Sequence, residues 1–185
     1  MVDELLGEVN SRMQKALDGL AKELGAIRAG RAAPALLDNV VVDYHGSPVP
    51  LHQLATVSVP EANLIIVQPW DRSSLRDIER AIQAANIGLN PANDGNVIRL
   101  AIPPLSEERR KELVKLVSKR VEDRRIAIRN IRRDGIEKLR EMEKNKEISQ
   151  DELKSNSKKI DQLTESYVES AGELGQRKES EIREI

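Results

Sequence analysis

The chain has 185 residues, and its 30 basic and 31 acidic side chains leave a net charge of −1. It contains no Cys, which excludes a disulfide scaffold, a thiolate zinc site and a cysteine nucleophile. No stretch approaches the roughly 20 apolar residues of a membrane span. Five acidic residues among the first 30 are unlike a signal or transit peptide. We therefore expect a soluble, cytoplasmic protein with no membrane partner.

Residues 2–29 are predicted to form one long amphipathic helix. Apolar side chains recur at steps of three and four residues, which places them in a single stripe along a helix about 42 Å long. The predicted stripe contains Leu6, Val9, Met13, Ala16, Leu17, Leu20, Leu24 and Ile27.

Residues 31–104 show a different, strand-rich pattern. Four short β-branched runs are typical of strands, at 39–43, 54–59, 64–68 and 96–102. The Gly-, Pro- and Asn-rich clusters between them, including 46–48 and 90–95, are predicted to be turns.

Within this part of the chain, residues 71–86 have a helical pattern. Leu75, Ile78, Ile82 and Ala85 would share one face of that helix. Residues 31–104 are therefore predicted to form a small β/α/β domain.

Two further long helices are predicted after the small domain. One spans residues 105–145, and its acidic first turn suits the positive end of the helix dipole. The next opens at Ser149, where Glu152 completes the pattern of a capping box. Only residues 145–148 separate the two, which favours an antiparallel hairpin. Gly135 lies inside the first of them, where glycine costs about 1 kcal/mol relative to alanine.

Three apolar stripes of this kind can bury one another. The predicted fold class is α+β: an elongated antiparallel three-helix bundle of residues 1–30 and 105–185, with residues 31–104 inserted as a hinged β/α/β domain. Because the insertion leaves and re-enters the same bundle, both connections must lie at one end, and we expect a two-armed, L-shaped molecule. The predicted hinge residues are Arg31, Ala32, Ala33, Pro34, Pro103 and Pro104.

The sequence offers little for catalysis. His45 and His52 are seven residues apart in a region of loops and strands, without an acidic partner at a characteristic spacing. No metal-ligand cluster, nucleophile elbow or phosphate-binding glycine loop is present. We expect no catalytic residue, no metal and no cofactor, and therefore a protein that is not an enzyme.

Charge is concentrated in two neighbouring segments. Residues 105–140 carry thirteen basic and seven acidic side chains, whereas residues 141–185 carry eight and twelve. On a helical wheel, one face beside the apolar stripe gathers Lys111, Lys115, Arg125, Arg129, Arg132, Arg133 and Arg140.

Two interpretations of this face remain open. Arginine forks suit phosphate groups, and with 2% aromatic residues a structured RNA is a better match than stacked single strands. The alternative is a solvated face that pairs with the acidic residues of its own chain.

Four strings of the sequence resemble the ribosome recycling factor family. They are IRAGRAAPALL at 27–37, NPANDGNVIR at 90–99, IPPLSEERRKEL at 102–113 and IAIRNIRRD at 126–134. The resemblance covers essentially the whole chain in order. It implies a translation factor without an active site that splits post-termination ribosomes into subunits together with elongation factor G, using GTP hydrolysis on that partner.

The resemblance also implies roles for particular residues. Arg129 and Arg132 match bundle arginines that contact large-subunit rRNA, and Arg28, Gly30 and Arg31 match residues that lie near the peptidyl-transferase region. Arg125 and Arg133 join the rRNA-binding set from the helical wheel rather than from the family motif. We expect a monomer. The alternatives are a general RNA- or DNA-binding protein and a coiled-coil scaffold, of which the latter explains the inserted domain poorly.

Overall fold

The computed structural model describes residues 1–27 and 30–184. The chain divides into two compact units, each with its own core. The helical unit comprises Met1–Arg28 and Glu107–Glu184, and the small unit comprises Ala29–Ser106. Among the described residues, no helix is long and apolar enough to cross a membrane.

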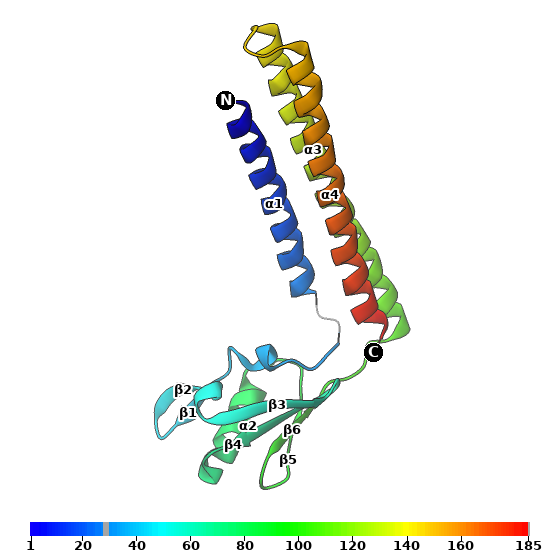
Figure 1. The fold of residues 1–185 in the computed structure, drawn as a ribbon. Coiled ribbons are helices and arrows are strands. Elements are labelled where there is room, and N and C mark those ends of the chain that lie inside the picture. The colour runs from blue at the N-terminus through cyan, green and yellow to red at the C-terminus, as the bar shows by residue number, and fades with distance from the viewer. Residues whose placement is uncertain (28–29, 185) are drawn as a thin grey trace. The chain divides into compact units, whose positions relative to one another are not determined.

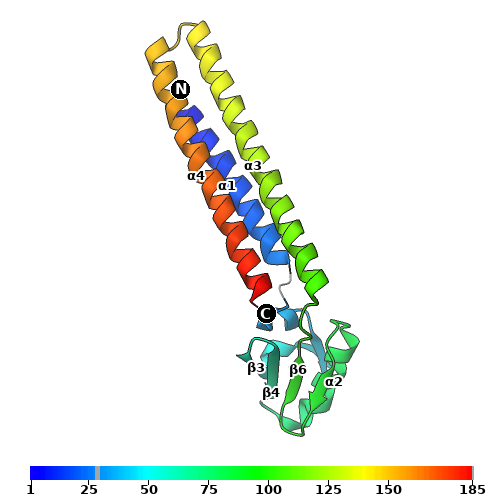
Figure 2. The ribbon, with the colours of Figure 1, turned by 90° about the vertical axis from the view of Figure 1, so that its right-hand side faces the viewer.

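Three long helices form the helical unit: α1 (Val2–Ala26), α3 (Glu107–Lys144) and α4 (Gln150–Arg183). They lie side by side in both views, and α3 runs antiparallel to the other two (Figures 1 and 2). This confirms the predicted three-helix bundle. Helix α1 ends earlier than predicted, because Ile27 adopts an extended conformation and its N–H bonds to the carbonyl of Leu24.

The predicted capping box at the start of α4 is confirmed. The Ser149 hydroxyl accepts a hydrogen bond from the Glu152 N–H at 3.1 Å, and the Ser149 N–H donates to the Glu152 carboxylate at 2.7 Å. Two backbone donors that the helix leaves unpaired are thereby satisfied. The hairpin between α3 and α4 is fixed at this point.

The apolar stripes meet in the centre of the bundle. In α1 the predicted stripe is buried except at Leu6, Leu17 and Ile27, which are only partly buried, and Leu5 is buried although it was not predicted to be. In α4 the apolar spacing predicts Leu163 in the stripe, but Leu163 is half-buried whereas the polar Asn156 and Thr164 are buried. Both polar side chains donate to carbonyls of the preceding turn, Asn156 to Glu152 and Thr164 to Ile160, each at 2.8 Å, so neither leaves a polar group unsatisfied.

Glycines allow the helices to approach closely. A Cβ on Gly135 would lie 2.9 Å from Cγ2 of Val9 and 3.2 Å from Cδ1 of Ile160, which belong to the two neighbouring helices. A Cβ on Gly175 would lie 2.7 Å from Cγ2 of Val121. The low helix propensity of Gly135 is therefore offset by packing that a larger residue would prevent.

The small unit has two antiparallel sheets. A hairpin pairs β1 (Val41–Tyr44) with β2 (Ser47–Pro50). The second sheet has the strand order β3-β4-β6-β5, formed by β3 (Ala55–Glu61), β4 (Leu64–Pro69), β6 (Ile98–Ala101) and β5 (Pro91–Asn93).

Helix α2 (Leu75–Ala84) covers one face of the second sheet. Its buried Leu75, Ile78 and Ile82 pack against Ile65 and Leu100, which are directly paired between β4 and β6. The alternation of side chains across a strand places these residues on the same face. Ala85, predicted on this buried face, is exposed because the helix ends at Ala84.

Two strands lie where turns were predicted. Both are edge strands: β2 pairs only with β1, and β5 pairs only with β6. Each contains proline, at Pro48, Pro50 and Pro91, which an edge strand tolerates because one side of it forms no ladder. Proline and glycine thus concealed two short strands in the sequence pattern.

Truncating apolar side chains should destabilise the bundle more at positions fully buried between the helices than at positions on the edge of the apolar stripe. Leu20→Ala and Ile160→Ala remove side chains that are 0% exposed and should each destabilise the helical unit by about 2–5 kcal/mol. Leu163→Ala, at a half-buried position one turn away, should cost clearly less. Urea unfolding followed by helical circular dichroism measures the three values, and equal losses at positions 160 and 163 would contradict the assigned seam.

Candidate nucleic-acid interface

Helix α3 carries the candidate interface. At 38 residues it is about 57 Å long, and it buries its apolar stripe between α1 and α4. The four predicted arginines of this helix, which we term the arginine face, are Arg125, Arg129, Arg132 and Arg133. The first three lie on the side next to α4.

Two members of the arginine face form ion pairs. Nε of Arg132 donates to Oδ1 of Asp161 on α4 at 2.6 Å, and both side chains keep nearly half of their surface exposed, at 45% and 46%. Arg129 donates to Oε1 of Glu122 two turns earlier on α3 at 3.4 Å. Exposed pairs of this kind contribute at most about 1 kcal/mol to stability. The guanidinium groups are thus held in place without being removed from solvent.

The other two members differ in exposure. Arg125 is partly buried: its Nε donates to the carbonyl of Val168 at 3.4 Å, and its guanidinium covers Gly172. Arg133 is exposed and has no hydrogen-bond or ion-pair partner among the described residues. The helical wheel gave the direction of these side chains, and the structure adds that α4 partly covers Arg125.

A shallow groove of ≈ 330 Å³ runs between the two helices beside Arg129 and Arg132. Asp161, Thr164, Glu165 and Val168 of α4 form its other wall. Two guanidinium groups therefore line the α3 side of the groove, and two carboxylates line the α4 side. The surface is mixed rather than uniformly positive.

Asp161 and Glu165 were missed as neighbours of the arginines, although the sequence contains a signal for them. In an antiparallel hairpin, residues equally far from the turn face each other. Arg132 and Asp161 are equally far from the centre of the turn at 145–148, and so are Arg125 and Val168. The position of the turn would therefore have identified the partners on α4.

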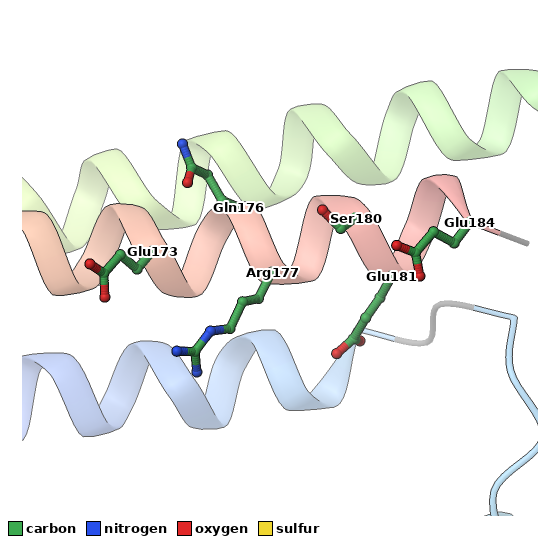
Figure 3. A pocket seen from close by; sticks show the side chains of 6 residues that line it. All are labelled: Glu173, Gln176, Arg177, Ser180, Glu181 and Glu184. Carbon is green, nitrogen blue, oxygen red and sulfur yellow. The ribbon is translucent and has the colours of Figure 1, made fainter.

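A second depression lies on the C-terminal part of α4. It measures ≈ 520 Å³, and its lining residues are Glu173, Gln176, Arg177, Ser180, Glu181 and Glu184. In Figure 3 the Arg177 and Glu181 side chains extend from α4 toward α1. Three carboxylates against one guanidinium make this depression unsuitable for phosphate.

The remaining predicted site residues belong to the connections. Arg28 lies outside the described residues. Gly30 has φ +74°, and a Cβ there would lie 2.9 Å from Cγ of Leu105, so the two connections touch at this point. Arg31 is exposed and engaged in an interaction of its own.

Both connections are attached to one turn of the small unit. The N–H of Ala32 donates to the carbonyl of Ala62 at 2.7 Å, and the N–H of Ile102 donates to the carbonyl of Asn63 at 2.8 Å. Pro34 opens a short 3₁₀-helix (Pro34–Leu37), whose Leu37 is buried in the core of the small unit. Ala32 and Pro34 are therefore tied into that unit.

No metal site accompanies these groups. Within residues 1–27 and 30–184, no cluster of three His, Asp or Glu side chains could hold an ion. The ring of His45 contacts that of Tyr44, with centroids 4.2 Å apart and the ring planes tilted by 60°, in a β1–β2 turn where the φ of His45 is +52°. The structure gives His45 a role in this turn.

Comparison with known proteins identifies the family. The sequence profile described as "Ribosome recycling factor" matches residues 20–182. Proteins named ribosome-recycling factor from Bacillus licheniformis and Thermomicrobium roseum are each 49% identical over all 185 residues, and the match covers each relative completely. The chain belongs to the ribosome recycling factor family.

Solved structures agree with this assignment. The solution structure of a ribosome recycling factor is 40% identical, with a TM-score of 0.71, and the match covers 100% of this chain and 98% of that one. A Thermus thermophilus ribosome recycling factor, placed with Escherichia coli elongation factor G on the E. coli post-termination complex, is 44% identical with a TM-score of 0.61 over 98% of both chains.

Family membership decides the class of function. The chain acts in protein biosynthesis as a ribosome-recycling translation factor and is not an enzyme. The arginine face lies entirely within the matched residues.

Proposed function

We propose that the arginine face binds large-subunit ribosomal RNA through its phosphates. The observation that carries this is the arrangement of Arg129, Arg132 and Arg133, which are all exposed and lie within about one turn of a long, well-packed helix. Three guanidinium forks on a rigid element match the regular spacing and high negative charge of an RNA backbone.

The intramolecular ion pairs are compatible with this role. Because the Arg132–Asp161 pair is nearly half exposed, an RNA phosphate competes with the carboxylate at little cost in stability. Arg125 adds positive charge to the same face while its Nε holds α3 to α4. Arg28, Gly30 and Arg31, in the segment that follows α1 in the sequence, remain candidates for an additional rRNA contact.

The proposed process is the splitting of post-termination ribosomes in the cytoplasm. The relative from Thermus thermophilus is bound there together with elongation factor G. We infer that this chain, as a monomer, works with the same kind of partner, whose GTP hydrolysis drives the step. A general RNA-binding protein or a scaffold would bind naked duplex or protein as well as it binds the large subunit.

We further propose that the two connections act as a hinge between the helical and the small unit. Since Ala32 and Ile102 are hydrogen-bonded to neighbouring carbonyls of one turn, three of the six predicted hinge residues remain for the pivot: Arg31, Pro103 and Pro104. To these we add Gly30, which precedes Arg31. Ala32, Ala33 and Pro34 then move with the small unit. A narrow pivot of this kind favours rotation over free tethering.

Removing two exposed guanidinium groups should weaken ribosome binding without unfolding the protein. Arg129→Ala/Arg132→Ala should lower affinity for isolated large subunits and reduce the slope of log affinity against log salt by about 1–2, since each arginine neutralises about one phosphate. Thermal stability should barely change, because exposed pairs contribute little. Affinity at several salt concentrations, measured beside a thermal melt, checks both expectations.

Matched variants make the test specific. Arg129→Lys/Arg132→Lys keeps the charge and should retain most of the salt dependence, while losing the bidentate geometry. Arg183→Ala, an exposed arginine at the far end of α4, should behave like the parent. If Arg129→Ala/Arg132→Ala left the affinity for large subunits unchanged, the proposal would be contradicted.

The hinge is tested by distances between spin labels. The chain has no Cys, so Asn96→Cys with Lys154→Cys places one label on each unit, and Ser11→Cys with Lys154→Cys places both on the helical unit. The first pair should give a broad distance distribution in solution and the second a narrow one. A narrow distribution for both pairs would contradict a hinge.

A further inference from the structure

The small unit has a cationic ridge of its own. It contains only five basic residues in 31–104, and three of them are Arg72, Arg76 and Arg80. They follow one another at intervals of four residues along α2 and the 3₁₀ turn that precedes it. Since Leu75, Ile78 and Ile82 face the core, the three arginines project from the opposite, exposed side.

These arginines are not neutralised by their own unit. In the part of the chain that the structure describes, no carboxylate lies within ion-pairing distance of any of the three. Of the nearby acidic groups, Asp71 accepts from Ser73 and Tyr44, and Glu79 accepts from Asn93. Asp77 on α2 is partly buried. The ridge therefore differs from the arginine face of α3, where two guanidinium groups meet carboxylates.

The four-residue spacing of these arginines is not explained by a contribution to the stability of α2. Like charges four residues apart on a helix repel, and this helix has only 10 residues. The surrounding sequence is acidic on balance, with seven acidic residues against five basic ones in 31–104, so the ridge is not a consequence of composition. All three are arginine, and none is lysine.

We propose that the α2 ridge, formed by Arg72, Arg76 and Arg80, is a second RNA-binding surface that contacts the phosphate backbone of ribosomal RNA. Steps of four residues advance about 6 Å along a helix, so the three forks form a row that can contact successive phosphates of one strand. Planar forks without internal partners are free to make bidentate contacts. We name ribosomal RNA as the partner because this chain belongs to the ribosome recycling factor family. The inference rests on the proposed function, since the ridge can contact ribosomal RNA only when the protein is bound to a ribosome.

The affinity of charge-removing variants for ribosomes tests whether the three arginines of the α2 ridge bind phosphate. Arg72→Ala/Arg76→Ala/Arg80→Ala in the full chain should weaken binding to whole ribosomes several-fold at low salt and reduce the salt slope by about 2–3. Arg99→Ala is the matched control, because β6 alternation places Arg99 on the sheet face away from α2, beside Asp94 at 3.6 Å. A thermal melt should show both variants folded. Unchanged affinity and slope in the triple variant would overturn the proposal.

Site-directed cleavage distinguishes RNA from an acidic protein surface. Because the chain lacks Cys, Gln83→Cys on the same exposed side of α2 carries a single tethered iron chelate. On ribosomes it should cut ribosomal RNA, and the cuts should disappear in the triple alanine background. Weakened affinity without such cuts would assign the ridge to a protein and overturn the proposal.

The two RNA-binding proposals fail separately. Arg129→Ala/Arg132→Ala reports on the helical unit alone, whereas the triple variant reports on the small unit alone. If only the α3 variant weakens ribosome binding, the α2 ridge is rejected and the proposed function stands. If the triple variant weakens binding and the α3 variant does not, the ridge stands and the proposed role of the arginine face falls.

Discussion

The close approach of three helices at glycine positions is the constraint on which the helical unit depends. Gly135 lies against Val9 of α1 and Ile160 of α4, and Gly175 of α4 lies against Val121 of α3, so α3 is in close contact with both of its neighbours. This packing keeps α3 regular over 38 residues. A cationic row on a frayed or bent helix could not stay aligned with a phosphate backbone, and the seam of glycine contacts therefore sets the geometry of the arginine face.

Ion pairs and hydrogen bonds between the helices orient several arginine side chains of this rigid bundle. The antiparallel hairpin places Asp161 opposite Arg132 and the carbonyl of Val168 opposite Arg125, while Arg124 is held to Glu23 of α1 at 2.5 Å and covers Gly19. Arginines toward the seam are thus used for joining helices, and those farther out remain accessible to solvent. The same helix joins the bundle on one side and offers cations on the other.

Much of this architecture could be predicted, because apolar periodicity over long helices is a strong signal. The three long helices and the capping box at Ser149 follow directly from residue spacing. Short edge strands such as β2 and β5 were not predicted, because their prolines and the neighbouring glycines and asparagines are typical of turns, although each strand pairs with a partner only a few residues away. The polar core positions Asn156 and Thr164 were also missed, since each satisfies its side chain within its own helix.

For the candidate site, the sequence predicted only the direction in which the arginine side chains point from the axis of one helix. A helical wheel gives the direction of Arg125 but not whether a neighbouring helix covers it, and α4 does. Likewise, the intrinsic cost of Gly135 was apparent from the sequence, whereas its benefit required the positions of Val9 and Ile160. The acidic partner of Arg132 was within reach of sequence reasoning, through the symmetry of the hairpin about residues 145–148.

A double-mutant cycle on Arg132 and Asp161, read as affinity for large ribosomal subunits, tests the central claim most directly. Asp161→Asn keeps an oxygen that can accept from Arg132 but removes the carboxylate that competes with RNA phosphate. The account predicts tighter binding for Asp161→Asn, weaker binding for Arg132→Ala, and a smaller gain from Asp161→Asn once Arg132 is absent. Affinity that is unchanged by Arg132→Ala, or lowered by Asp161→Asn, would contradict it.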